Sequence, residues 1–217
     1  MSTPIIETRH LTKYFKTPRG MLHAVEDVSL TIEPGKTIGV VGESGCGKTT
    51  LGRVITRLEE ATSGEVYLDG REILQLKGRE KNAIYHDMQM IFQDPYSSLN
   101  PRMSVGNIIA DPIETMGAKM SHKELNQKVL HLMETVGLPA RYYNQYPHEL
   151  DDGRRQRVGL ARALALDPKF IVCDEPVSAL DVSIQAQILN LLMDLQDQKQ
   201  LAYMFITHNL FVVKHIS

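Results

Sequence analysis

The chain has 217 residues, of which 42% are hydrophobic, and this is enough to build one domain, or one domain with a subdomain, around a buried core. Its 24 lysines and arginines against 26 aspartates and glutamates give a formal net charge of −2, which excludes a general electrostatic attraction to nucleic acid or anionic lipid. No segment approaches the roughly 20 apolar residues of a membrane-spanning helix, and the N-terminus lacks the layout of a signal peptide, so the sequence predicts a cytoplasmic protein.

Two segments near the N-terminus are predicted to be strands. Residues 5–10 and the alternating stretch 23–32 (HAVEDVSLTI) predict a small antiparallel flank. Tyr14 and Phe15 lie between them, outside either predicted strand. A purine ring needs a flat apolar surface to stack on, and either aromatic side chain could supply it. Filling the local core is the alternative for each of the two.

The segment Gly42 to Thr49 (GESGCGKT) has the pattern of a phosphate-binding loop. It follows the apolar run Ile38 to Val41 and precedes a helix predicted from Thr50 to Leu58, whereas a chance Gly-rich turn is the alternative. Its glycines allow backbone N–H groups to turn inward around phosphate oxygens. Lys48 would reach the β- and γ-phosphates, and the Thr49 hydroxyl would bind Mg²⁺. The predicted nucleotide contacts in this segment are Gly42, Glu43, Ser44, Gly45, Cys46, Gly47, Lys48, Thr49 and Thr50.

The next predicted strands end in polar residues. Ser63-Gly64 is expected to break the chain before a short strand, Glu65 to Leu68, which ends in a turn. The apolar strand Met88 to Phe92 is followed at once by Gln93. Ligands of open α/β sheets bind at the carboxyl ends of strands, so Gln93 could reach a metal or an attacking water. A plain turn residue at the end of a strand is the alternative.

A helical insertion is predicted from Pro101 to about Leu166, because a period typical of helices replaces strand alternation there. Its clearest helix runs from Ser121 to Gly137, with Ser121 as the cap and Glu124 three residues later. The insertion ends in residues 150–157 (LDDGRRQR) and a helix up to Leu166.

A strand that ends in two acids follows the insertion. Four apolar residues, Phe170 to Cys173, precede Asp174 and Glu175. Asp174 can hold Mg²⁺, directly or through water, and Glu175 can orient and deprotonate an attacking water. Acidic pairs at strand ends are common as turns, but together with GESGCGKT this pair predicts Mg²⁺-dependent hydrolysis.

The last segments place one histidine at the end of a strand. The turn Ser178 to Asp181 (SALD) precedes a helix predicted over Val182 to Lys199, and a strand follows over Ala202 to Ile206. His208 comes directly after this strand and could donate a hydrogen bond to a γ-phosphate oxygen. A structural role is the alternative for an isolated histidine.

With these motifs in this order, the chain from Ile5 to Ser217 resembles the nucleotide-binding subunit of an ABC transporter. Residues 93–102 (QDPYSSLNPR) and 146–150 (YPHEL) are similar, more narrowly, to the ATPases of dipeptide, oligopeptide and nickel importers. The resemblance implies an α/β fold: a P-loop NTPase core with a mostly parallel sheet, an antiparallel flank and an inserted helical subdomain. It divides one domain into a nucleotide-binding core, residues 1–93 and 167–217, and a helical subdomain, residues 94–166.

The resemblance also assigns roles to single residues. Phe15, or Tyr14, would stack on adenine, and Asp181 would lie in a loop at the dimer contact. The residues implied in catalysis are Glu175, His208, Gln93 and Lys48. The ligands implied for Mg²⁺ are Thr49, Gln93 and Asp174.

The resemblance implies partners as well. Two ATPase subunits would sandwich two ATP molecules head to tail, each phosphate loop being capped by the other subunit's signature motif. The helical subdomain would dock on integral-membrane permease subunits, with Gln93 at its hinge, and act indirectly with an extracytoplasmic solute-binding protein. The expected site is the cytoplasmic face of the membrane, with no nucleic-acid partner.

The signature motif departs from the family pattern. The usual L-S-G-G-Q is replaced by Leu150, Asp151, Asp152, Gly153 and Arg154. A carboxylate 4 Å from a phosphate oxygen charge is repelled by roughly 4 kcal/mol at an effective dielectric of 20. Arg154 and Arg155 could offset part of this by pairing with the acids. We therefore expect an impaired ATP site at this signature and a competent site at this chain's own phosphate loop, which favours a heterodimer. The alternative is that the acids turn aside and the loop still binds ATP.

Two further expectations concern the C-terminal residues of the sequence and the alternative functions. Residues 209–217 are predicted to start a helix that stops without a cap, so the chain is expected to be a fragment. A soluble ABC-type ATPase that acts on DNA or ribosomes would use the same core. A regulatory nucleotide-binding subunit with one degenerate site is suggested by the altered signature, but Glu175 and His208 argue against complete inactivity.

Overall fold

The computed structural model describes residues 3–117 and 119–216, which form two compact units. The first unit takes the described residues within Met1–Met90, Lys169–Glu175 and Met193–Ser217. The second takes those within Ile91–Pro168 and Pro176–Leu192. The limits predicted for a helical subdomain, residues 94–166, stay a prediction.

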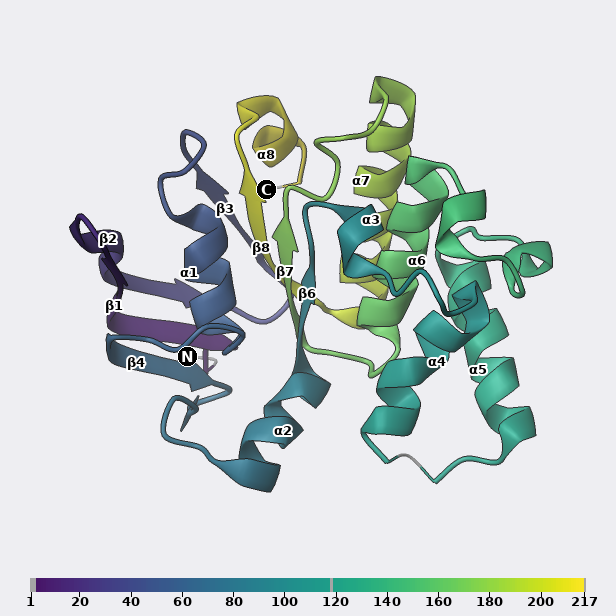
Figure 1. Cartoon of the computed structure of the whole chain (residues 1–217), viewed down its shortest axis with the longest axis horizontal. Helices are drawn as coiled ribbons and strands as arrows, with labels where there is room; N and C mark the ends of the chain where they lie inside the picture. Colours follow the sequence, from purple (N-terminus) through teal and green to yellow (C-terminus); the bar gives the residue numbers. More distant parts are fainter. Residues whose placement is uncertain (1–2, 118, 217) are drawn as a thin grey trace. The chain divides into compact units, whose positions relative to one another are not determined.

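The first unit contains an antiparallel sheet of four strands near the N-terminus (Figure 1). Its order is β2-β1-β4-β5, with bounds Gly20–Ile32, Ile6–Thr17, Ser63–Leu68 and Arg71–Glu72. Both N-terminal strands are longer than predicted, and Ser63 and Gly64 begin a strand rather than break the chain.

The placement of Tyr14 and Phe15 outside the predicted strands was wrong. Both lie in β1, where Tyr14 pairs with His23 and Phe15 with Leu22 on β2. The register of β1 on β2 shifts three times between Thr8 and Tyr14. Such bulges interrupt the two-residue alternation on which the strand prediction rested.

The second sheet contains two strands in which every residue is buried. Its order is β3-β8-β7-β6, with bounds Thr37–Val41, Ala202–Thr207, Phe170–Asp174 and Met88–Ile91. β3 and β7 each run parallel to β8. Every residue of β7 and β8 is buried, as expected for parallel strands covered on both faces. The predicted α/β fold with a mostly parallel sheet and an antiparallel flank is confirmed.

Helix α1 (Lys48–Ile55) contacts strands of both sheets, namely β1 and β2 of one and β7 and β8 of the other. A Cβ at Gly52 would lie 2.8 Å from Val172 Cγ1, so glycine lets the helix backbone approach β7 closely. The short helix α8 (Leu210–Ile216) contacts β3 and β8. Helix α2 (Gly78–Asp87) was not predicted, because Ile84 is its one buried residue and gives no apolar stripe.

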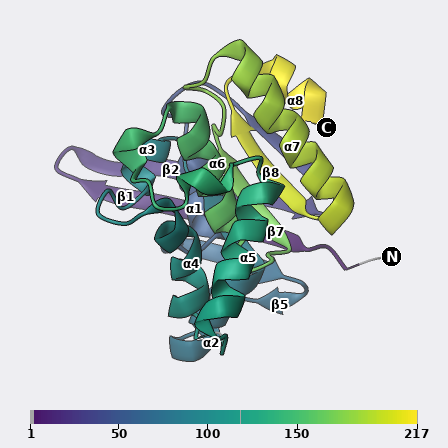
Figure 2. The ribbon, with the colours of Figure 1, turned by 90° about the vertical axis from the view of Figure 1, so that its right-hand side faces the viewer.

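The second unit is mainly helical. Its helices are α3 (Pro95–Ser98), α4 (Val105–Thr115), α5 (His122–Thr135) and α6 (Asp152–Leu164), and short 3₁₀ helices cover Ala140–Tyr142 and Pro147–Glu149. Helices α4, α5 and α6 pack against one another (Figure 2). The predicted capping box is confirmed: Glu124 N donates to Ser121 Oγ at 3.3 Å, and Ser121 N donates to Glu124 Oε2 at 2.7 Å. Helix α7 spans Val182–Lys199, as predicted.

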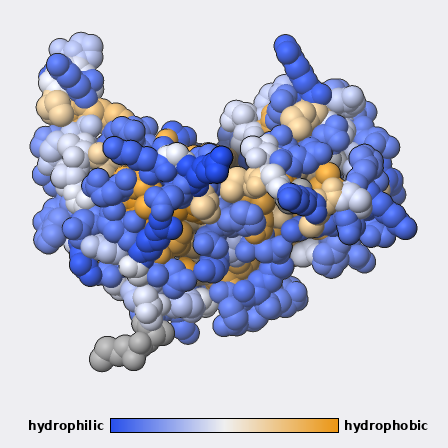
Figure 3. Space-filling view, turned by 90° about the horizontal axis from the view of Figure 1, so that it is seen from below, coloured by the Kyte–Doolittle hydropathy of each residue, from blue (hydrophilic) through white to orange (hydrophobic). Residues whose placement is uncertain are grey.

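Most large apolar side chains are inside these two units. The face of the protein in Figure 3 is mainly hydrophilic, with hydrophobic residues showing between the hydrophilic ones. Across the described part of the chain, none of the helices has the length and apolarity required to cross a membrane.

The core position of α1 gives a first prediction. Ile55 is 0% exposed, so Ile55→Ala should lower the free energy of unfolding by about 2–5 kcal/mol, because it leaves a cavity under the sheets. Leu58→Ala, three residues later at a side chain 49% exposed, is the matched control and should change it by about 0.5 kcal/mol or less. Urea unfolding measures both variants. Equal losses would contradict the packing described for α1.

Candidate nucleotide-binding site

The predicted phosphate loop connects the end of β3 at Val41 to the start of α1 at Lys48. Gly45 and Gly47 have φ angles of 79° and 97°, in the left-handed region that favours glycine. A Cβ at Gly47 would lie 1.9 Å from the carbonyl oxygen of Ala24, so no other residue fits there without a shift of β2. The loop is therefore a tight backbone cradle that rests against β2.

The side chain of Lys48 is folded into this loop. The residue is 8% exposed, and its ammonium Nζ donates to the carbonyl oxygens of Gly42 at 2.9 Å and Glu43 at 2.7 Å. These carbonyls hold the ammonium at the start of α1, where a lysine charge and the positive end of a helix favour phosphate oxygens.

Thr49 and Asp174 meet where α1 begins and β7 ends. Thr49 Oγ1 donates to Asp174 Oδ1 at 2.9 Å, and Asp174 is 2% exposed. Burial raises the pKa of Asp174 above its usual range, although the Thr49 hydrogen bond and the charge of Arg53 act in the opposite direction. A hydroxyl and a carboxylate are hard oxygen donors, so this pair fits the preference of Mg²⁺.

Glu175 and His208 follow two neighbouring parallel strands. His208 Nδ1 lies 3.2 Å from Glu175 Oε2, and the side chains are 60% and 14% exposed, respectively. The backbone of Glu175 has a φ of 45°, rare for a residue with a side chain, and its N–H donates to Ile206 O at 2.9 Å. The structure thus brings together the two residues predicted to act on the γ-phosphate side.

The two candidate adenine-stacking residues have different surroundings. The Tyr14 ring stacks on His23 with centroids 3.9 Å apart, and its hydroxyl donates to Glu26 at 2.7 Å. This hydrogen bond raises the pKa of Tyr14 and lowers that of Glu26. The Phe15 ring instead lies 4.6 Å from the ammonium of Lys13.

The sequence did not single out His23 and Glu26, whose side chains also meet at 2.6 Å. Nothing in their spacing connects them to Tyr14, because the pairing with β1 depends on bulges. They flank Ala24, whose carbonyl touches the phosphate loop at Gly47.

Two predicted site residues belong to the second unit. Gln93 is exposed between β6 and α3, and Asp181 is exposed directly before α7. Their roles beside a metal and at a dimer contact stay predictions.

The altered signature lies at the start of α6. Asp151 caps this helix, and its Oδ1 accepts from Arg154 N at 2.8 Å. The Arg154 guanidinium also pairs with the Asp151 carboxylate, and Arg155 Nη1 lies 2.5 Å from Asp152 Oδ1. The acids and arginines pair as the sequence suggested. Because such exposed pairs contribute about 0.2–1 kcal/mol each, they offset the carboxylate charges only in part.

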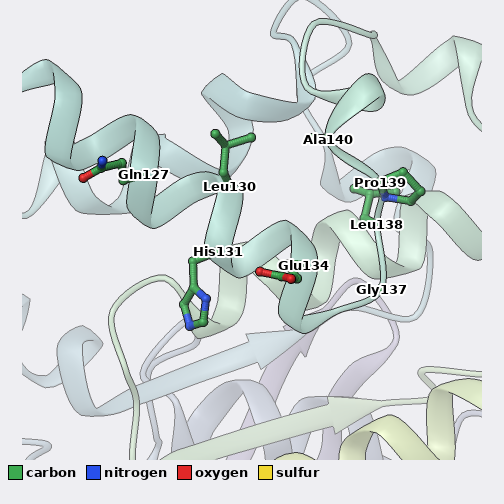
Figure 4. Close-up of a pocket in the computed structure, with 8 residues that line it drawn as sticks. All are labelled: Gln127, Leu130, His131, Glu134, Gly137, Leu138, Pro139 and Ala140. Atoms are coloured by element: carbon green, nitrogen blue, oxygen red, sulfur yellow. The ribbon is translucent and has the colours of Figure 1, made fainter.

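A cavity of about 660 Å³ lies in the second unit between one face of α5 and the loop that follows it (Figure 4). Its lining residues are Gln127, Leu130, His131, Glu134, Gly137, Leu138, Pro139 and Ala140. The sequence predicted none of them as functional, and the candidate nucleotide site is built from other residues.

Comparison with known proteins gives one family. The family model described as ABC transporter matches residues 25–178. The oligopeptide transport ATP-binding protein OppF of Bacillus subtilis (strain 168) is 54% identical over 218 residues, which cover 100% of this chain and 72% of that protein. The dipeptide transport ATP-binding protein DppF of Haemophilus influenzae is 48% identical over 222 residues, covering 100% of this chain and 68% of that protein.

A solved structure has the same fold. A dimeric structure of a post-hydrolysis state of the ATP-binding cassette MJ0796, bound to ADP and Pi, superimposes with a TM-score of 0.89. It is 30% identical and covers 97% of this chain and 90% of that one.

The structural roles of Gly45 and Gly47 in the loop can be distinguished by substitution. Gly45→Ala should lower the free energy of unfolding by about 1–2 kcal/mol, because a Cβ meets no atom there within 4 Å but the left-handed backbone is strained. Gly47→Ala should lower it further and abolish nucleotide binding, since its Cβ overlaps the Ala24 carbonyl. Thermal unfolding and nucleotide titration measure both. Equal effects of the two variants would contradict this loop geometry.

The raised pKa of Asp174 lowers the stability of the folded state at neutral pH. The folded state holds this proton more tightly than the unfolded state, so the ionised carboxylate opposes folding at neutral pH, and this cost falls as pH drops through the raised pKa. Asp174→Asn, which can still accept from Thr49, should therefore have a higher Tm than the parent at pH 7, with a smaller difference near pH 4. Thermal unfolding at several pH values measures this. A lower Tm of Asp174→Asn at pH 7, or a difference independent of pH, would contradict it.

Proposed function

Because the chain belongs to the ABC transporter family, we propose that it is the ATP-hydrolysing subunit of an importer for di- or oligopeptides. The observation that carries the proposal is the contact of Thr49 with Asp174, which joins the phosphate loop to the acid pair within one compact unit. The peptide substrate is supported by relatives named as oligopeptide and dipeptide transport proteins. None of the named relatives favours a soluble ATPase acting on DNA or ribosomes.

The phosphate loop would hold the nucleotide. Its backbone N–H groups and Lys48 would bind the β- and γ-phosphate oxygens, with the ammonium turning from the carbonyls of Gly42 and Glu43 toward phosphate. Phe15 or Tyr14 on β1 would stack on adenine.

Thr49 and Asp174 would hold Mg²⁺, with Gln93 as a further candidate ligand. The bound ion would neutralise charge that develops on the phosphate oxygens during transfer. Asp174 enters this role as a carboxylate whose raised pKa reflects the cost of burying its charge, and a cation would offset that cost.

Glu175 would act as the general base. Its carboxylate, at the end of β7, would orient and deprotonate the attacking water. The contact of His208 Nδ1 with Glu175 Oε2 fixes the carboxylate, and the imidazole would donate a hydrogen bond toward the γ-phosphate as charge develops there.

The active assembly would be a dimer bound to permease subunits. In it, the signature at the start of α6 would meet the partner's nucleotide, and Asp181 would lie at the dimer contact. Residues 94–166 would dock on the permease, with Gln93 at the hinge, and the chain would then lie at the cytoplasmic face of the membrane.

The altered signature favours a heterodimer. Asp151 and Asp152 are paired with Arg154 and Arg155, but both carboxylates remain about 60% exposed, at 58% and 60%. Their charge would oppose a γ-phosphate across the interface, so this signature would complete an impaired site. The competent site would combine this chain's phosphate loop with an intact signature from a different ATPase subunit.

The role of Glu175 can be tested directly. Glu175→Gln should lower steady-state ATP hydrolysis by about 10²–10⁴-fold, because it removes the general base, while ATP affinity stays within experimental error. Glu114→Gln, an exposed acid on α4, is the control and should hydrolyse ATP at the parental rate. Parental hydrolysis by Glu175→Gln would contradict the assignment.

The signature can be restored by substitution. Asp151→Ser/Asp152→Gly keeps a residue that caps α6 and removes both charges, so it should raise ATP hydrolysis roughly tenfold or more in a mixture with a family ATPase that carries L-S-G-G-Q. Asp194→Asn/Asp197→Asn removes two exposed acids of α7 and is the control. Full activity of the chain alone, unchanged by the restoration, would show that these carboxylates do not face a phosphate.

A further inference from the structure

A second cavity lies in the first unit, away from the phosphate loop. It has a volume of about 470 Å³ and is lined by residues between 57 and 64, after α1, and between 74 and 81, at the start of α2. These segments lie in the connection from α1 to β4 and in the connection that enters α2, whose three elements are labelled in Figure 1. Helix α1 is about 12 Å long at 1.5 Å per residue, and the phosphate loop is at its other end. The cavity is therefore separate from the candidate nucleotide site.

The wall of this cavity has an excess of positive charge. Arg57, Lys77 and Lys81 line it together with one acid, Glu60, which gives a formal charge of +2. Among the residues that the structure describes, the ammonium groups of Lys77 and Lys81 make no hydrogen bond or ion pair. Like charges that converge on one concave surface repel one another, and a bound anion would remove this repulsion.

Arg57 is held in place by its neighbours. Its Nη1 donates to the carbonyl oxygens of Ile73 at 2.6 Å and Leu76 at 3.0 Å, and its own carbonyl accepts from the Tyr85 hydroxyl at 3.1 Å. In the described part of the chain, Nε and Nη2 have no partner of their own. A guanidinium fixed on one side, with donors left on the other, is prepared for an anion at little entropic cost.

A second part of the lining, Thr62 and Ser63, is also fixed. Thr62 N donates to Thr12 O at 2.8 Å, and Thr62 Oγ1 accepts from Tyr14 N at 2.9 Å, which fastens this part of the lining to β1. The neighbouring Ser63 hydroxyl adds a donor to the lining. Charged groups and hydroxyls predominate over apolar side chains, which argues against an apolar ligand.

We propose that this cavity is a binding site for a small anion that carries at least two negative charges. Its volume falls within the roughly 300–1,000 Å³ that small-molecule sites occupy. Arg57 would bind the anion in a fixed orientation, and Lys77 and Lys81 would contribute charge and hydrogen bonds from α2. Carboxylate and phosphate ligands share the required chemistry.

Calorimetric titration of the purified chain at physiological ionic strength tests this site without nucleotide or hydrolysis. The chain carries Lys48→Ala, so that anion binding at the phosphate loop is weakened, and the two probes are citrate and inorganic pyrophosphate. The test variant adds Lys77→Gln/Lys81→Gln, and the matched control adds Lys119→Gln/Lys123→Gln, two exposed lysines of the second unit.

At least one probe should bind saturably, and Lys77→Gln/Lys81→Gln should weaken it by roughly tenfold or more, because two charged hydrogen bonds are lost. The control should bind as the parent does. Tighter citrate identifies a carboxylate ligand, and tighter pyrophosphate a phosphate ligand. Binding of neither probe, or a loss as large in the control, overturns the proposal. Because no step involves ATP, this result is independent of the proposed hydrolysis.

Discussion

The burial of one carboxylate, that of Asp174, is the constraint on which the candidate site depends. Asp174 ends β7, whose five residues are all buried, so the acid is held beneath the surface by the sheet itself. Burying a charge is unfavourable unless it is paired, and the Thr49 hydroxyl at the start of α1 is the partner that the fold supplies. This hydrogen bond sets the distance between the phosphate loop and the acid pair, and it leaves a buried negative charge that a divalent cation would neutralise.

Both sheets contact the helix that carries Thr49. Helix α1 contacts strands of both, and Gly52 lets its backbone come close to Val172 on β7. The loop itself lies against β2, because Gly47, directly before α1, leaves no room for a Cβ beside the Ala24 carbonyl. The antiparallel sheet therefore supports the candidate site, since β2 supplies the surface against which the loop is folded and β1 carries the two aromatic residues predicted to stack on adenine.

Local sequence patterns predicted much of this unit. The phosphate loop and the strand that ends at Asp174 were predicted because each depends on a pattern of fewer than ten consecutive residues. The start of α5 was also predicted correctly, from Ser121 and Glu124. The bulges in β1 left no periodic signal, so the strand positions of Tyr14 and Phe15 were missed. The roles predicted for Gln93 and Asp181 depend on a bound metal and on a second subunit, and local sequence patterns do not encode either.

The joint role of Thr49 and Asp174 in holding Mg²⁺ can be tested by equilibrium binding of ATP, with and without Mg²⁺, to the parent chain and to Thr49→Val. The variant keeps the shape of residue 49 and removes the hydroxyl that joins the loop to Asp174. Mg²⁺ should tighten ATP binding by roughly tenfold or more in the parent and by much less in Thr49→Val. Equal tightening by Mg²⁺ in both proteins would show that the metal is held elsewhere and not by Thr49 and Asp174.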